Sequence, residues 1–101
     1  MNMQMIMQQA KKMQTQLLKE QEELNKTEYE GSSSLVNIKI NGNFDVLSVK
    51  INIADGDNIE ADDVEMLEDM IMVALNDAIS KAQADKEKKM GKYGQGLAGL
   101  M

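Results

Sequence analysis

The chain has 101 residues, a net charge of -6, no cysteine and no histidine, and all eleven of its basic residues are lysine. Without cysteine and histidine the chain has no disulfide, no thiolate metal site and none of the commonest general base. Its carboxylates fall in solvated runs and not in an apolar cleft. We therefore expect no enzyme, cofactor, metal site or small-molecule substrate. A chain of this length forms one domain with a modest core, which burial against a partner chain would help to complete.

The charge is distributed unevenly along the chain. Residues 28–77 contain twelve acidic residues and two lysines, whereas residues 1–27 and 78–101 have net charges of +1 and +3. The overall acidity argues against nucleic acid as a partner, but the two basic ends would allow it. No apolar run approaches the length of a membrane span, and the Met-rich start lacks the pattern of a secretory signal. We therefore expect a soluble cytoplasmic protein with no membrane partner.

The first expected element is a long amphipathic helix from about Met3 to Lys26. Its apolar residues recur at intervals of three and four, which is the period of one helix face. Three lysines fall on nearly the opposite side and predict a basic stripe that points away from the core: Lys12, Lys19 and Lys26. The alternative is an ordinary solvated face, in which neighbouring glutamates form ion pairs with these lysines.

Three strands are expected between two helices. Thr27–Glu30 indicates a short first strand, and Gly31 with the three serines after it indicates a flexible turn. Two further runs alternate apolar and polar residues, which predicts two strands that each have one covered face. Their apolar residues are Val36, Ile38 and Ile40 in the first run, and Leu47, Val49, Ile51 and Ile53 in the second.

Asn41-Gly42 lies between these two runs and is a strong hairpin signal, because both residues tolerate the positive φ of a type I′ turn. The apolar residues are even-numbered before the turn and odd-numbered after it, so the numbers of cross-strand partners must add up to an odd sum. A two-residue loop with Ile40 opposite Asn43, or a four-residue loop with Ile40 opposite Asp45, meets this condition. A three-residue loop would place one apolar set in water.

The segment that follows, ADGDNIEADD, is acidic and rich in turn formers. It is not a calcium loop, because Glu60 and Met66 occupy the positions where such a loop needs glycine and a bidentate acid. We expect Asp62 or Asp63 to cap the second helix, with Glu65 completing an acidic variant of the capping box.

The second helix is expected from about Asp63 to near Met90. Its middle, from Met70 to Leu75, is apolar on all sides, which a helix that only covers a sheet does not require. A second copy of the chain, packed by two-fold symmetry, would bury the extra surface. The alternative is burial between the chain's own sheet and first helix. Residues 1–90 would form the domain and residues 91–101 a flexible Gly-rich tail. The expected interface residues are Met70, Ile71, Met72, Val73 and Leu75.

The elements give an α+β fold in the order α-β-β-β-α, a three-stranded antiparallel meander flanked by two long helices. Three segments carry a further likeness: MNMQMIMQQAKKMQTQLLKEQEEL at the start, SLVNIKINGNFDVLSVKI in the centre and EMLEDMIMVALNDA in the second helix. Together they resemble the YbaB/EbfC family of bacterial nucleoid-associated proteins over nearly the whole chain. The resemblance implies a tweezer-like homodimer whose helical arms bind DNA in the nucleoid.

Two functions of different classes are compatible with these features. The first is DNA binding by a homodimer through lysines of both helices: Lys11, Lys12, Lys19, Lys26, Lys81, Lys88 and Lys89. Relatives in the family usually offer some arginine in the arms, but here only lysine is present, and lysine holds a phosphate as a point charge. Contacts to duplex DNA should therefore be mainly to the backbone, with weak sequence preference. The second function is an acidic homodimeric adaptor that binds proteins through its Met-rich start and apolar tail, without touching DNA.

Overall fold

The computed structural model describes residues 2–98, with side chains through residue 91, and shows an elongated molecule with extents of 73 × 22 × 14 Å. The strands form one antiparallel sheet in the order β1-β2-β3. This confirms the predicted α+β fold. Its elements are helix α1 (Met3–Lys26), strands β1 (Glu28–Ser33), β2 (Val36–Asn41) and β3 (Val46–Ile51), the 3-10 turn η1 (Ala61–Asp63) and helix α2 (Val64–Ala98).

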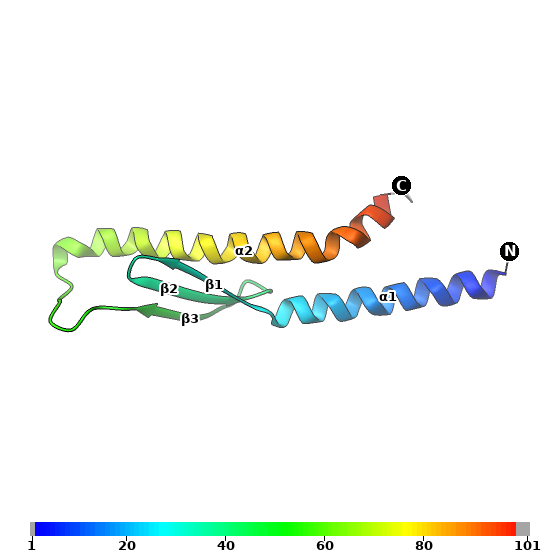
Figure 1. Cartoon of the computed structure of the whole chain (residues 1–101), viewed down its shortest axis with the longest axis horizontal. Helices are drawn as coiled ribbons and strands as arrows, with labels where there is room; N and C mark the ends of the chain where they lie inside the picture. Colours follow the sequence, from blue (N-terminus) through cyan, green and yellow to red (C-terminus); the bar gives the residue numbers. More distant parts are fainter. Residues whose placement is uncertain (1, 99–101) are drawn as a thin grey trace.

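Helix α2 lies along the sheet and continues past one end of it (Figure 1). Helix α1 extends away from the same end of the sheet, where it leads into β1. The free ends of the two helices therefore project from the same side of the sheet. Within residues 2–98, no helix is both long enough and apolar enough to cross a bilayer.

The core lies between α2 and the first two strands. Val36, Ile38 and Ile40 of β2 are buried, as the alternation predicted, and they form one cluster with small residues of α2, namely Ala74, Ala78 and Ala82. Alanine at intervals of four residues gives α2 a flat stripe, which lets the helix approach the sheet closely.

Gly31 of β1 lies directly against the backbone of α2. A Cβ on Gly31 would lie only 2.1 Å from the carbonyl oxygen of Ala74. The prediction of a turn at this glycine was wrong: Gly31 is a buried strand residue, and β1 continues to Ser33. The turn is the two-residue loop Ser34-Leu35, since Ser33 pairs with Val36.

The β2–β3 hairpin differs from the predicted type I′ turn. Gly42 does not have a positive φ, whereas Phe44 has a φ of 65°. The Asn41 carbonyl accepts a hydrogen bond from the Phe44 N–H at 2.9 Å, and the Asn41 side chain accepts from the N–H groups of Asn43 and Asp45. Asparagine thus closes the turn with its own side chain, a common use of this residue.

The register of β3 follows the predicted parity for most of its length. Val36 pairs with Ile51 and Ile38 with Val49, and the register then shifts beside Ile40, which leaves Leu47 as an extra residue. Ile40 pairs with Val46, so neither of its expected partners, Asn43 or Asp45, is observed. The bulge brings the residues after it back into the predicted phase of the strand.

Strand β3 nevertheless lies beyond the cover of α2. Val46, Val49 and Ile51 share the face of the buried β2 residues, yet they are 51%, 50% and 39% exposed. The alternation in this strand predicted one covered face, and within the described residues the chain itself does not provide the cover. An apolar strip along β3 is left in water.

Gly42 has a role that its φ does not explain. It is buried against the end of α1, and a Cβ there would lie 1.8 Å from the Leu24 carbonyl oxygen. We expect Gly42→Val to destabilise the fold by about 1–3 kcal/mol, because backbone atoms must move apart. Urea unfolding followed by circular dichroism measures this. An unchanged midpoint would show that α1 does not rest on the hairpin.

Helix α2 starts from a capping arrangement one turn earlier than predicted. Asp63 accepts a hydrogen bond from the Glu60 N–H at 3.0 Å, and the Asp63 N–H donates to the Glu60 carbonyl. These two residues form the capping box of η1, the turn that leads into α2. Asp63 was one of the two expected caps, but here it is the last residue of the box, and the box contains neither Asp62 nor Glu65. At its other end, α2 continues past Met90 to Ala98. The flexible tail and the domain boundary at residue 90 stay predictions, and residues 99–101 lie outside the described part of the chain.

Candidate nucleic-acid interface

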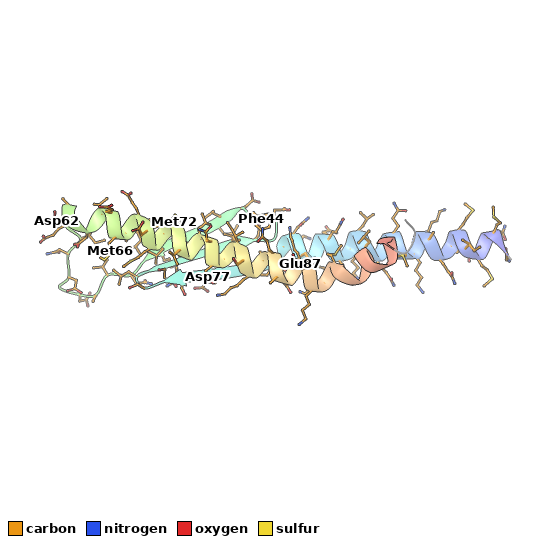
Figure 2. The ribbon with its side chains drawn as sticks, turned by 90° about the horizontal axis from the view of Figure 1, so that it is seen from above. Phe44, Asp62, Met66, Met72, Asp77 and Glu87 are labelled. Carbon is orange, nitrogen blue, oxygen red and sulfur yellow. The ribbon has the colours of Figure 1, made fainter. Side chains whose placement is uncertain are left out.

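Helix α1 is an arm that stands almost free of the rest of the chain. Every residue from Asn2 to Gln16 is exposed, and Leu24 is the only buried residue of the helix. The Asn2 side chain caps the start of the helix by accepting a hydrogen bond from the Gln4 N–H at 3.0 Å. Viewed from above, the arm extends beyond the end of α2 with side chains on all sides (Figure 2). A ligand could therefore approach its outer turns from any direction.

The outer part of this arm is the basic region of an acidic protein. Residues 3–19 contain Lys11, Lys12 and Lys19 and no acidic residue, while the rest of the chain carries all seventeen acidic residues against eight lysines. Within the described residues these three lysines form no ion pair. The arrangement places a positive field at one end of the molecule, away from the acidic sheet region.

Three of the other predicted DNA-binding lysines are held by carboxylates of the same chain. The Nζ atoms of Lys26, Lys81 and Lys89 lie 3.4, 3.3 and 3.2 Å from carboxylate oxygens one turn earlier on their helices. Lys88 lines a groove at the base of α1 together with Glu20 and Glu23. The structure therefore does not bring the seven lysines together on one surface. It divides them into a free group on the arm and a group beside acidic residues.

Lys81 and Asp77 close the outer edge of β1, a role that sequence reasoning missed. The Lys81 ammonium donates to the Glu30 carbonyl at 2.9 Å, and Asp77 accepts from the Ser32 N–H at 3.2 Å. This backbone hydrogen bond, helped by Lys81, lowers the pKa of Asp77. The i, i+4 spacing of the pair was visible in the sequence, but it could not show that a strand edge lies beside it.

Tyr29 and Asp85 form a second link between β1 and α2. The Tyr29 hydroxyl donates to the Asp85 carboxylate at 2.5 Å. Burial, followed by this hydrogen bond, raises the pKa of Tyr29 from 10.0 to about 12. The pKa of Asp85 is lowered, first by the Tyr29 hydroxyl and then by Lys89. Lys89 is thus part of a structural network rather than a free cation.

The raised pKa of Tyr29 predicts a loss of stability in strong base. Because the folded pKa lies above the unfolded value of 10.0, the contribution of the neutral phenol is complete below pH 10 and disappears as pH rises toward about 12. Tyr29→Phe should be less stable than the wild type at pH 8, by about 1 kcal/mol for one hydrogen bond. The two unfolding free energies should converge between pH 10 and 12. Parallel profiles over that range would contradict the assignment.

The five residues predicted at a dimer interface also divide into two groups. Met70, Ile71 and Leu75 pack against the chain's own core. Met72 and Val73 are 57% and 50% exposed. Packing against the chain's own sheet therefore covers part of three of the five residues, without the first helix that the alternative also required, and the other two remain in water.

One flank of α2 is turned toward the β3 side of the sheet. Lys86 lies over the Phe44 ring, 4.5 Å from its centroid, and Phe44 is in the turn that leads into β3. Ile79 is seven residues before Lys86 and therefore on the same flank of the helix. Further half-buried residues follow at intervals of four toward the start of α2, namely Leu75 and Ile71. This flank faces the side of the sheet where β3 lies.

Comparisons with known proteins agree on one family. The model of the YbaB/EbfC DNA-binding family matches residues 1–97. The chain is 38% identical to a nucleoid-associated protein of Ligilactobacillus salivarius, over 99% of this chain and 95% of the relative. It is 42% identical to one of Chloroflexus aurantiacus, over 99% of both chains. A third, from Lactococcus lactis subsp. cremoris, is 40% identical over 96% of this chain and 97% of the relative.

Proposed function

The chain belongs to the YbaB/EbfC DNA-binding family, and from this premise we propose that it acts as a nucleoid-associated homodimer that binds duplex DNA through α1, with weak sequence preference. The observation that carries the proposal is the exposed arm of residues 3–19, which is basic and free of acidic residues in a chain of net charge -6. The protein would then act in the cytoplasm, on the nucleoid. The relatives reported above are named nucleoid-associated proteins.

The spacing of the arm lysines suits a row of phosphates. Lys12 and Lys19 lie on one face of α1, separated along the helix axis by roughly 10 Å. Lys11 adds a third cation on the adjoining face. A lysine ammonium neutralises a phosphate but lacks the planar fork with which arginine reads a guanine edge. Affinity would therefore come mainly from the DNA backbone and depend strongly on salt.

The remaining predicted lysines would contribute less. Lys26, Lys81 and Lys89 would have to leave a carboxylate partner before binding a phosphate. Lys81 would in addition give up its hydrogen bond to β1. We therefore place the principal contacts on Lys11, Lys12 and Lys19, and we keep Lys88 as a secondary candidate at the base of the arm.

The exposed apolar strip supports a homodimer. The described part of the chain leaves Val46, Val49 and Ile51 of β3 exposed, and the α2 flank on the same side of the sheet carries the half-buried Ile71 and Leu75. A two-fold partner that packs on this strip would complete a core that is small for one domain. It would also double the number of arms and of phosphate contacts. The interface would include two of the five residues predicted from the sequence, and it would extend onto β3.

The test is DNA binding at several salt concentrations with a matched pair of variants. We expect Lys12→Gln/Lys19→Gln to weaken binding to all duplexes alike, because it removes four phosphate contacts from a dimer. The log–log slope of affinity against salt should become shallower by about 3.6. The control Lys39→Gln/Lys50→Gln makes the same change in net charge on the sheet and should bind like the wild type. Fluorescence anisotropy with two unrelated duplexes measures both.

Two results would count against the proposal. Equal weakening by the arm variant and the sheet variant would mean that net charge, and not the arm, governs binding. A confirmed dimer that binds no duplex at low salt would exclude direct DNA binding and leave the adaptor function.

A further inference from the structure

The arm is rich in glutamine as well as lysine. Five of the eight glutamines in the chain lie between residues 4 and 16, where every side chain is exposed. Within the described residues none of these five side chains makes a hydrogen bond, so their amide groups are available to a ligand. They are Gln4, Gln8, Gln9, Gln14 and Gln16.

Two of these glutamines share a face with the arm lysines. Gln8 and Gln16 lie one helical turn before and one turn after Lys12, and Gln16 is three residues before Lys19. The face therefore alternates amides and ammonium groups over three turns. Gln14 is on nearly the opposite side of the helix, since two residues correspond to a rotation of roughly 200°.

We infer that Gln8 and Gln16 contact adenine edges in the major groove while Lys12 and Lys19 hold the flanking phosphates. The inference rests on the proposed function and adds the base that the arm prefers. A glutamine amide can donate to adenine N7 and accept from the adenine N6 amino group, a pattern that the major groove offers only at A·T pairs. Phosphate contacts by lysine carry no such information.

The shape of the arm fits this placement. A helix with its side chains is roughly 10–12 Å wide, and the major groove is about 12 Å wide, so one bare helix can enter it. Only a helix that stands clear of its own protein can do so along several turns. The outer turns of α1 meet this condition because they extend beyond α2 (Figure 2) and are exposed on all sides. Glutamate and aspartate, which the phosphates would repel, do not occur in this stretch.

The experiment compares an A·T-rich duplex with the same duplex in which the adenines are replaced by 7-deazaadenine. This base keeps its Watson–Crick pairing but lacks the N7 acceptor. We expect the full-length wild type to bind the substituted duplex about fivefold more weakly, the low end for a single base contact. The variant Gln8→Ala/Gln16→Ala should bind both duplexes with equal affinity. Gln14→Ala, a matched change off the contact face, should keep the wild-type difference.

The outcomes distinguish this inference from the proposed function. If the wild type binds both duplexes equally while Lys12→Gln/Lys19→Gln loses affinity, the arm binds DNA through its backbone alone, and only the inference is wrong. An unchanged difference in Gln8→Ala/Gln16→Ala would also overturn it. If the lysine variant binds like the wild type, the proposed function fails and the inference fails with it. All variants lie on an exposed helix, and circular dichroism confirms that the helix is retained.

Discussion

Gly31→Val should remove most of the folding free energy of the chain. A Cβ at this position would lie 2.1 Å from the Ala74 carbonyl oxygen and 2.4 Å from the Ala78 backbone nitrogen. Both are backbone atoms of a helix, so no side-chain rotation can relieve the overlap. Helix α2 would have to move off the sheet, which exposes buried residues such as Val36 and Ile38. We expect a loss of at least about 3 kcal/mol, the upper end for overpacking.

Gly91→Ala provides the matched control for this change. It adds a methyl group at a helical glycine of α2 where nothing lies within 4 Å. Here the alanine should stabilise the chain by about 0.5–1 kcal/mol, because it restricts the unfolded chain without creating a clash. Urea unfolding of both variants gives the comparison. If Gly31→Val unfolds at the wild-type midpoint, β1 and α2 are not in close contact.

Val49→Asp is expected to separate the proposed homodimer into folded monomers. Val49 is half exposed in one chain, so a carboxylate there can stay hydrated in the monomer. In a dimer that covers the β3 strip, the same charge would be buried without a partner, which is strongly unfavourable. Light scattering after size exclusion should therefore report a mass near 11.3 kDa for the variant and twice that value for the wild type.

The control for Val49→Asp is Lys50→Asp, the next residue of β3, whose side chain points to the other face of the sheet. This variant should remain a dimer. Dissociation by both variants would mean that charge, not burial, weakens the assembly, and a monomeric wild type would exclude the homodimer altogether. Ile71→Asp is a less selective test, because Ile71 also packs against the core of its own chain.

Local patterns in the sequence predicted the elements well. The apolar period gave α1 its observed bounds, Met3–Lys26, and the alternation in β2 identified its three buried residues. Such patterns depend only on neighbours within a few residues, so a single sequence is enough to predict where these helices and strands lie and which of their residues are buried. The exposure of the arm lysines followed from the same helical period.

The errors have a common physical cause, which is contact between distant segments. Gly31 was expected in a turn and Gly42 at a positive φ, but each glycine is instead required by a backbone that approaches from elsewhere, at Ala74 and at Leu24. Lys81 looked like a free cation because its acceptor, the Glu30 carbonyl, is 51 residues away. The bulge at Leu47 is a local exception: it follows a turn held by Asn41 hydrogen bonds to residues two and four positions later, which a count of loop residues does not reveal.

The closed edge of β1 limits how far copies of this protein could aggregate. An uncovered strand edge is a template to which another strand can add, and a sheet with two such edges can grow into a filament. Here Asp77 and Lys81 already occupy the outward Ser32 N–H and Glu30 carbonyl, so no strand can add at β1 without displacing them. Among the residues that the structure describes, only the edge at β3 is left without a partner. If two copies join through their β3 sides about a two-fold axis, the only edges left are the closed β1 edges. No further copy could then add a strand, and assembly would stop at the dimer.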